Sequence, residues 1–118
     1  MLRIMIIRWF INTVALGIAS HLVSGIYYYQ FEDLVIAAAL FGLLNTFIKP
    51  LLLLLTLPIN LLTLGLFTFV INAVMLGLTG SFLSGFIVTG FWSALGGAII
   101  ISIVSIVLNS MFKEDKYR

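Results

Sequence analysis

The longest uninterrupted feature of this chain is a stretch without charge. From Pro50 to Phe112, more than half of the chain, there is no Asp, Glu, Lys or Arg, and the single histidine, His21, lies outside it. Soluble domains contain about a quarter charged residues, because they need a polar exterior. Here only 8% of the residues are charged and 63% are hydrophobic. Lipid removes the need for a polar exterior, so the sequence predicts an integral membrane protein.

The apolar residues divide into four segments, at roughly 3–23, 33–49, 61–83 and 91–112. A helix needs about 20 residues to cross ~30 Å of hydrocarbon. The second segment falls short of this length, although the Lys49 ammonium can extend to the interface. Spanning strands are excluded, because a membrane barrel needs about eight or more strands of alternating polarity. The expected fold is therefore all-α, with four transmembrane helices.

The two halves of the chain resemble each other when the sequence is shifted by sixty positions without a gap. Polar, glycine and aromatic positions coincide as well as apolar ones: Asn12 with Asn72, Gly17 with Gly77, Ser24-Gly25 with Ser84-Gly85, Phe31 with Phe91, and Ala38 with Ala98. Self-similarity at a fixed period predicts an internal duplication. One membrane domain, 1–118, would then hold two tandem repeats, at about 1–60 and 61–118. Two crossings in each repeat make the repeats parallel, related by an axis along the membrane normal.

All basic residues are expected on one side of the membrane. They lie at the N-terminus, in the central connection and at the C-terminus, whereas the connections at about 24–32 and 84–90 have none: Arg3, Arg8, Lys49, Lys113, Lys116 and Arg118. Because basic residues favour the cytoplasmic side, both termini and the central connection are expected there.

The connections differ in their expected structure. Residues 26–29 and 86–89 are rich in types that favour strands, and two such segments related by a twofold axis could pair antiparallel. Asp33 and Ser93 are expected to be the N-caps of the helices that follow. In the central connection, Pro50 should end the second helix. The leucines at 51–55 are expected to lie at the cytoplasmic interface, or to dip into the membrane covered by protein.

Amide and small side chains are the candidate packing residues. Amides in hydrocarbon need partners, and an interhelical amide bond contributes about 0.6–2 kcal/mol. Asn12, Asn45 and Asn72 are therefore expected to hold helices together, with a polar pathway as the functional alternative. Small residues at four-residue spacing let helices approach closely, within one chain or between chains: Gly17, Gly77, Ala38, Gly42, Ala94, Ala98 and Ser102.

The sequence offers little for catalysis. It has no cysteine, which excludes disulfides and thiolate sites. His21 has no fixed partners and is expected to be solvated at the interface. We find no phosphate loop, metal motif or nucleophile–base pair, and no acidic residue at mid-membrane depth of the kind that coupled transporters use. Neither an enzyme, a cofactor nor a metal is expected, and a net charge of +2 is too small for nucleic-acid binding.

The order of Asn, Pro and Gly landmarks carries a family resemblance. They occur in residues 44–50 (LNTFIKP), 57–58 (LP), 63–67 (TLGLF), 71–73 (INA), 84–86 (SGF) and 90–95 (GFWSAL). This order resembles the mycobacterial four-transmembrane phage holin family, superfamily IV, a group of small bacterial membrane proteins. The resemblance implies a location in the bacterial inner membrane and a protein that oligomerises there to form lesions.

Three functions remain open at this point. The first is a self-associating, holin-like bundle. The second is a structural or accessory subunit of a larger membrane complex, and the third is a small channel at the repeat interface, built around Asn12 and Asn72. The expected partners are the lipid bilayer, further copies of the chain and, for the second function, a larger membrane complex.

Overall fold

The computed structural model describes residues 2–116, with side chains described up to residue 111. Within this range the chain forms helices throughout, apart from two short strands and the turns. The elements follow in the order α1 (Leu2–Leu22), β1 (Ile26–Tyr28), α2 (Phe31–Phe47), α3 (Lys49–Leu55), α4 (Leu57–Leu62), α5 (Phe67–Phe82), β2 (Phe86–Val88) and α6 (Gly90–Lys116).

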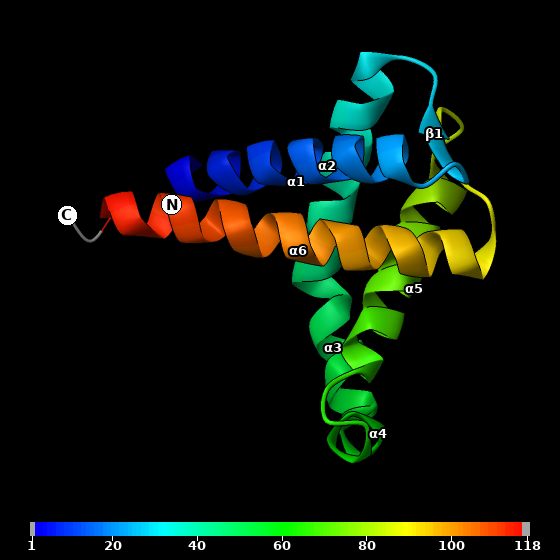
Figure 1. The fold of residues 1–118 in the computed structure, drawn as a ribbon, viewed down its shortest axis with the longest axis vertical. Helices are drawn as coiled ribbons and strands as arrows, with labels where there is room; N and C mark the ends of the chain where they lie inside the picture. The colour runs from blue at the N-terminus through cyan, green and yellow to red at the C-terminus, as the bar shows by residue number, and fades with distance from the viewer. Residues whose placement is uncertain (1, 117–118) are drawn as a thin grey trace.

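The helices form two pairs that cross each other (Figure 1). In one pair α1 runs beside α6, and in the other α2, continued by α3, runs beside α5. Helix α1 also packs on α2, and α5 packs on α6, so the main contacts close into a ring of four helices. The start of α1 and the end of α6 lie at the same end of their pair, while α4 lies at the far end of the other pair.

The two strands confirm the predicted pairing of the connections. Strands β1 and β2 are antiparallel, and their central partners are Tyr27 and Ile87, sixty positions apart. Two further backbone bonds extend the ladder evenly on both sides: Thr89 N donates to Gly25 O at 2.9 Å, and Tyr29 N donates to Gly85 O at 3.2 Å. The aromatic and β-branched residues of these segments favour the extended backbone that this pairing requires.

The predicted N-caps are wrong by a few residues. Helix α2 begins at Phe31 and α6 begins at Gly90, so Asp33 and Ser93 lie inside the first turns. Asp33 still stabilises the start of α2, because its Oδ2 accepts a hydrogen bond from the backbone N of Gln30 at 3.1 Å. A side chain three residues into a helix that reaches back in this way satisfies an otherwise free amide.

The central connection also differs from the prediction. Helix α2 does end near Pro50, but α3 resumes at Lys49 and continues in the same direction. A proline in the first turn of a helix is tolerated, because its missing N–H would have no partner there. The result is one apolar stretch, Phe31–Leu55, of 25 residues, which is long enough to cross a membrane. The second segment is therefore not the short one.

Among the four predicted spans, the short one is instead the third, because α5 has only 16 residues. Residues 61–66, which were expected to belong to it, form the end of α4 and a turn. Leu64 and Gly65 both have left-handed backbone angles, with φ of 56° and 88°, and Gly65 N donates to Asn60 O at 2.8 Å. The described residues thus contain three helical stretches long enough to span a membrane, and α5 as a shorter apolar helix.

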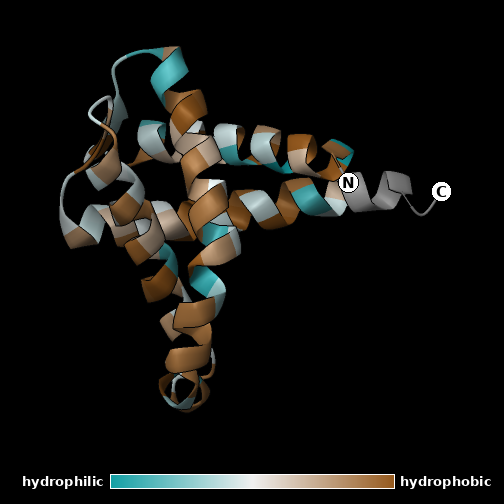
Figure 2. Ribbon diagram, turned by 180° about the vertical axis from the view of Figure 1, so that it is seen from behind, coloured by the Kyte–Doolittle hydropathy of each residue, from teal (hydrophilic) through white to brown (hydrophobic). Residues whose placement is uncertain are grey.

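Burial follows the same positions in both halves of the chain. Side chains sixty positions apart are buried together in eight cases: Ile11 with Ile71, Ala15 with Met75, Leu16 with Leu76, Ala19 with Thr79, Ile26 with Phe86, Leu34 with Ala94, Ala38 with Ala98, and Phe41 with Ile101. The outside of the helices is also mostly hydrophobic (Figure 2). A protein that is apolar both inside and outside is suited to lipid rather than to water.

Lysine and arginine positions near the C-terminus are only partly described. Helix α6 includes the backbone of Lys113 and Lys116, but their side chains lie outside the described residues, as does Arg118 altogether.

Candidate functional site

The amide of Asn72 joins two helices. In α5, Asn72 Nδ2 donates a hydrogen bond to Ser102 Oγ of α6 at 3.2 Å. Ser102, expected only as a small packing residue, is therefore also a hydrogen-bond acceptor. A polar bond of this kind between membrane helices is satisfied without water, so it does not by itself form a pathway.

Asn12 occupies the equivalent place between α1 and α2. Its Nδ2 lies 3.1 Å from the position that a Cβ on Gly42 would take. Gly42 is the counterpart of Ser102, but it has no hydroxyl to offer. The two halves therefore bring the same pair of positions together, with a hydrogen bond in one half and only close packing in the other.

Asn45 lies one turn beyond Gly42 on α2. Its Oδ1 is buried and has no hydrogen-bond partner among the described residues. A buried acceptor without a partner costs about 1–3 kcal/mol. Asn45 thus lacks the interhelical bond at its carbonyl oxygen that the sequence led us to expect.

Most of the small residues lie at contacts within the chain. Ala38, Ala94 and Ala98 are buried. A Cβ on Gly17 would stand 3.5 Å from Leu34 Cδ2, which is ordinary contact, whereas a Cβ on Gly77 would meet nothing within 4 Å. These stripes therefore serve mainly to bring helices of the same chain together, with open space beside Gly77.

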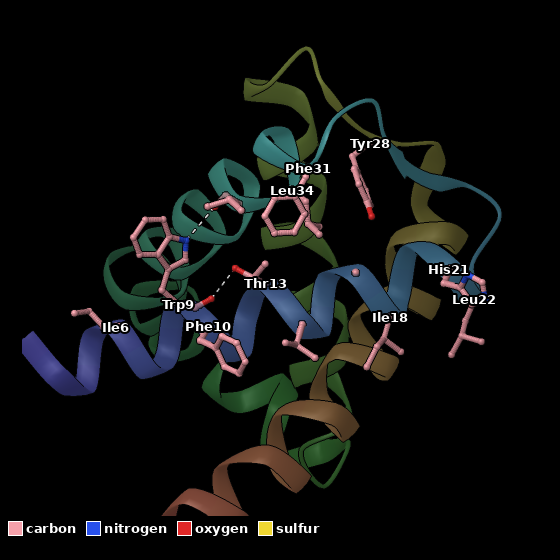
Figure 3. Close-up of a pocket in the computed structure, with 13 residues that line it drawn as sticks. Ile6, Trp9, Phe10, Thr13, Ile18, His21, Leu22, Tyr28, Phe31 and Leu34 are labelled. Atoms are coloured by element: carbon pink, nitrogen blue, oxygen red, sulfur yellow. Dashed lines mark hydrogen bonds between the residues drawn. The ribbon is translucent and has the colours of Figure 1, made fainter.

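A cavity of about 780 Å³, largely open to the outside of the molecule, lies between α1 and the start of α2. Figure 3 shows its lining: Ile6 and Trp9 lie toward one end of α1, and His21 and Leu22 toward the other. Trp9 Nε1 donates to the backbone O of Val35 at 3.0 Å, which ties the two helices together at one end. Tyr28, from β1, and His21 provide polar groups at the opposite end.

A pattern in the sequence of α1 indicates this cavity, although no prediction was based on it. The lining residues of α1 recur every three or four positions, at 6, 9, 10, 13, 14, 17, 18, 21 and 22, which is one continuous helix face. His21 is exposed at the end of that face. Its counterpart in the other half is Ser81, so the equivalent face of α5 has a hydroxyl where α1 has an imidazole. This difference is visible when the two halves of the sequence are compared.

Acidic and histidine side chains do not gather into a metal site in the described part of the chain: no three His, Cys, Asp or Glu residues come together there. The polar features of these residues are instead the amides of Asn12, Asn45 and Asn72 and the polar end of the cavity. A further amide that the sequence reasoning missed is the buried Asn60, whose Oδ1 accepts a hydrogen bond from Thr68 Oγ1 at 3.2 Å.

Long apolar helices, joined by short connections and hydrophobic on the outside, define a multi-pass helical membrane protein. Residues 3–107 match the family described as mycobacterial 4 TMS phage holin, superfamily IV, and the chain belongs to this family.

Two similar proteins come from bacteria. The uncharacterized protein SCO3922 of Streptomyces coelicolor is 46% identical over 85 residues, covering 69% of this chain and 68% of the relative. The uncharacterized membrane protein YvlD of Bacillus subtilis is 33% identical over 105 residues, or 88% of each chain. No solved structure matches the chain.

Proposed function

We propose that this protein is a self-associating helical unit of the bacterial inner membrane, and that a single copy is closed to ions. The main support for this proposal is that side chains fill the core where the two helix pairs cross. Ala15, Leu16, Met75 and Leu76 meet there with 0% of their surfaces exposed. A pathway for ions needs polar or water-lined surface through the hydrocarbon, so any holin-like lesion would have to form between copies.

Self-association is supported by how little of each helix the chain itself covers. In the most apolar window of Phe31–Leu55, only 11% of the residues are buried. The remaining surface must face lipid or another protein. Native mass spectrometry from mild detergent tests this directly: a defined oligomer is expected, and a chain that stays monomeric in several mild detergents would contradict the proposal.

Lesion formation is a separate step with its own test. Inducible expression in bacteria is expected to lower the membrane potential only above the concentration at which copies assemble. Asn72→Leu tests the channel alternative, because it removes one of the two amides around which that alternative is built and leaves the lipid-facing surface intact. Liposome flux that is present at low protein density and lost in Asn72→Leu would favour the channel over the closed single chain.

The duplication is the architectural part of the proposal. The symmetric strand register about Tyr27 and Ile87 supports a pseudo-twofold axis that relates residues 1–60 to 61–118. The matched burial of Leu16 with Leu76 and of Ala38 with Ala98 supports the same axis. An axis through the strand pair exchanges the α1/α6 pair with the α5/α2 pair, which agrees with two parallel repeats.

The proposed orientation has both termini and the α3–α4 turn in the cytoplasm. The positions of Arg3, Arg8 and Lys49 support this by the positive-inside rule. Because the chain has no cysteine, single cysteines at Arg3, Tyr29 and Leu62 can be labelled one at a time in intact cells. Labelling of Tyr29→Cys alone by an impermeant reagent is expected, and labelling of Arg3→Cys from outside would reverse the orientation.

An accessory role in a larger complex is the second candidate, and one surface favours it. The end of α4 and the turn that follows it carry highly exposed leucines, with Leu62 at 85% and Leu64 at 92%. If this turn protrudes beyond the lipid, it needs a protein partner. Stable co-purification of a second protein that is lost in Leu62→Ser would support the accessory role over self-association.

A further inference from the structure

The cavity beside α1 is bounded by the Trp9–Val35 hydrogen bond but is not filled by the side chains that the structure describes, and its shape and polarity point to one kind of occupant. We propose that it binds the acyl chain of a phospholipid, with the polar headgroup at the end formed by His21 and Tyr28. This proposal does not depend on self-association or on pore formation.

The length of the cavity favours a chain-like ligand. Its lining on α1 extends from Ile6 to Leu22, sixteen positions along one helix face. At 1.5 Å per residue this is about 24 Å, most of the ~30 Å thickness of the hydrocarbon. A compact molecule would leave much of this length empty, whereas an extended hydrocarbon chain follows it.

The distribution of polar atoms favours an amphiphile. Along the middle of the cavity the lining is apolar, with Phe10, Val14, Ile18 and Leu34. The two polar groups nearer the Trp9 end are already engaged: Trp9 Nε1 donates to Val35 O at 3.0 Å, and Thr13 Oγ1 donates to Trp9 O at 2.8 Å. Polar groups for a ligand are thus concentrated at the other end.

His21 and Tyr28 form that polar end. His21 is exposed and Tyr28 is half-buried, and both line the cavity close to the strands (Figure 3). An imidazole and a phenol can each donate a hydrogen bond, which suits the phosphate or ester oxygens of a phospholipid. The cavity therefore matches a ligand with one long apolar part and one polar head.

The other half of the chain provides an internal comparison. At the equivalent positions, Trp9 is replaced by Phe69, His21 by Ser81 and Tyr28 by Val88. The aromatic donor, the imidazole and the phenol are all lost there. Because the imidazole and the phenol occur in the first half only, we assign the headgroup contact to that half.

A second copy of the chain is the competing occupant. It would press a helix of about 10 Å diameter along α1 and cover His21 with apolar side chains, which leaves a polar group without a partner. A lipid headgroup meets the same group with acceptor oxygens. Both occupants predict contact along α1, so the experiment must separate them.

The test uses the whole protein in nanodiscs that contain a phosphatidylglycerol with a photoactivatable group on one acyl chain. Adducts are expected mainly on residues 6–22 and 31–35, several-fold above those on the exposed face of α6 around Ile103 and Ile106. An even distribution over both faces would overturn the proposal, because it would indicate non-specific surrounding lipid.

Two variants fill the cavity and one serves as a matched control. Gly17→Leu places a side chain into the cavity next to Leu34, and Val14→Phe enlarges a residue that already lines it. Each should reduce the adducts on α1 at least threefold. Gly77→Leu adds the same bulk at the equivalent position, where space is open, and should leave the adducts on α1 unchanged. If both filling variants are as stable as the parent and keep their adducts, the cavity is not the site.

Two further measurements test the headgroup contact and the competing occupant separately: lipid retention and disulfide cross-linking. The double variant His21→Ser, Tyr28→Val copies the other half and should retain several-fold less lipid in native mass spectra after detergent washing. Unchanged retention would contradict the headgroup assignment. A single Ile18→Cys should not form disulfides between copies in lipid, and efficient cross-linking there would assign the face to a second copy instead.

Discussion

The α-carbon of Gly85 lies directly against the carboxylate of Asp33, so that a Cβ at position 85 would overlap the carboxyl group. The same relationship recurs sixty positions away, where a Cβ on Gly25 would overlap the side chain of Ser93. Each glycine belongs to the connection of one half, and each partner to the first turn of a helix in the other half. The end of the molecule that carries the two strands is therefore held by a reciprocal contact that admits no side chain at either glycine.

Gly85→Ala should destabilise the protein because the new methyl group forces the start of α2 away from the strands. Overpacking of this kind typically costs about 1–3 kcal/mol, and a lower midpoint of thermal unfolding in detergent would report it. Gly77→Ala is the matched control, since a Cβ there meets nothing within 4 Å, and it should be neutral or slightly stabilising. The double variant Gly85→Ala, Asp33→Ala should recover part of the loss, and no recovery would contradict the proposed collision.

Gly42→Ser should give Asn12 the hydrogen-bond partner that Asn72 already has in Ser102. The Cβ would lie 3.1 Å from Asn12 Nδ2, so the flexible amide must move slightly. Gly42→Ala introduces the same Cβ without a hydroxyl. We expect the serine variant to be more stable than the alanine variant by about 0.6–1.7 kcal/mol, the range for such bonds between membrane helices. Equal unfolding midpoints for the two variants would mean that the new bond does not form.

Asn45→Leu should stabilise the protein, because it replaces a buried acceptor that has no partner with an apolar side chain of similar size. The expected gain is about 1–3 kcal/mol, the cost of the unsatisfied group. Asn72→Leu should have the opposite sign, since it breaks the bond to Ser102. The unfolding midpoints of the two variants are compared in the same detergent. If both variants lose stability, Asn45 has a hydrogen-bond partner after all.

Leu64→Gly should stabilise the turn between α4 and α5. Leu64 has a φ of 56° and is 92% exposed, so it bears the strain of a left-handed backbone without packing in return. For residues with a Cβ this region costs roughly 1–2 kcal/mol. Gly65→Ala, at a φ of 88°, should be destabilising instead. Thermal unfolding of the two variants gives the comparison, and a destabilised Leu64→Gly would indicate that the exposed leucine contributes through lipid or a partner.

The sequence alone determined the class of protein and the general layout of its helices and strands. The uncharged stretch from Pro50 onward required a membrane, and the strand-forming residues around Tyr27 and Ile87 predicted the antiparallel pair. The match to the phage holin family was also visible in the order of its Asn, Pro and Gly landmarks. These properties depend on composition and on local backbone preference, which do not need knowledge of distant contacts.

Only the tertiary structure decided where helices end and which side chains meet. Pro50 was expected to stop the second helix, yet its place in the first turn of α3 let the apolar stretch continue to Leu55. The contacts of Asp33 with Gly85 and of Ser93 with Gly25, the unpaired oxygen of Asn45 and the cavity beside α1 were equally absent from the prediction. Each of them depends on how residues far apart in the chain approach one another, and that packing is set by the sum of many weak contacts across the whole fold, which no local pattern contains.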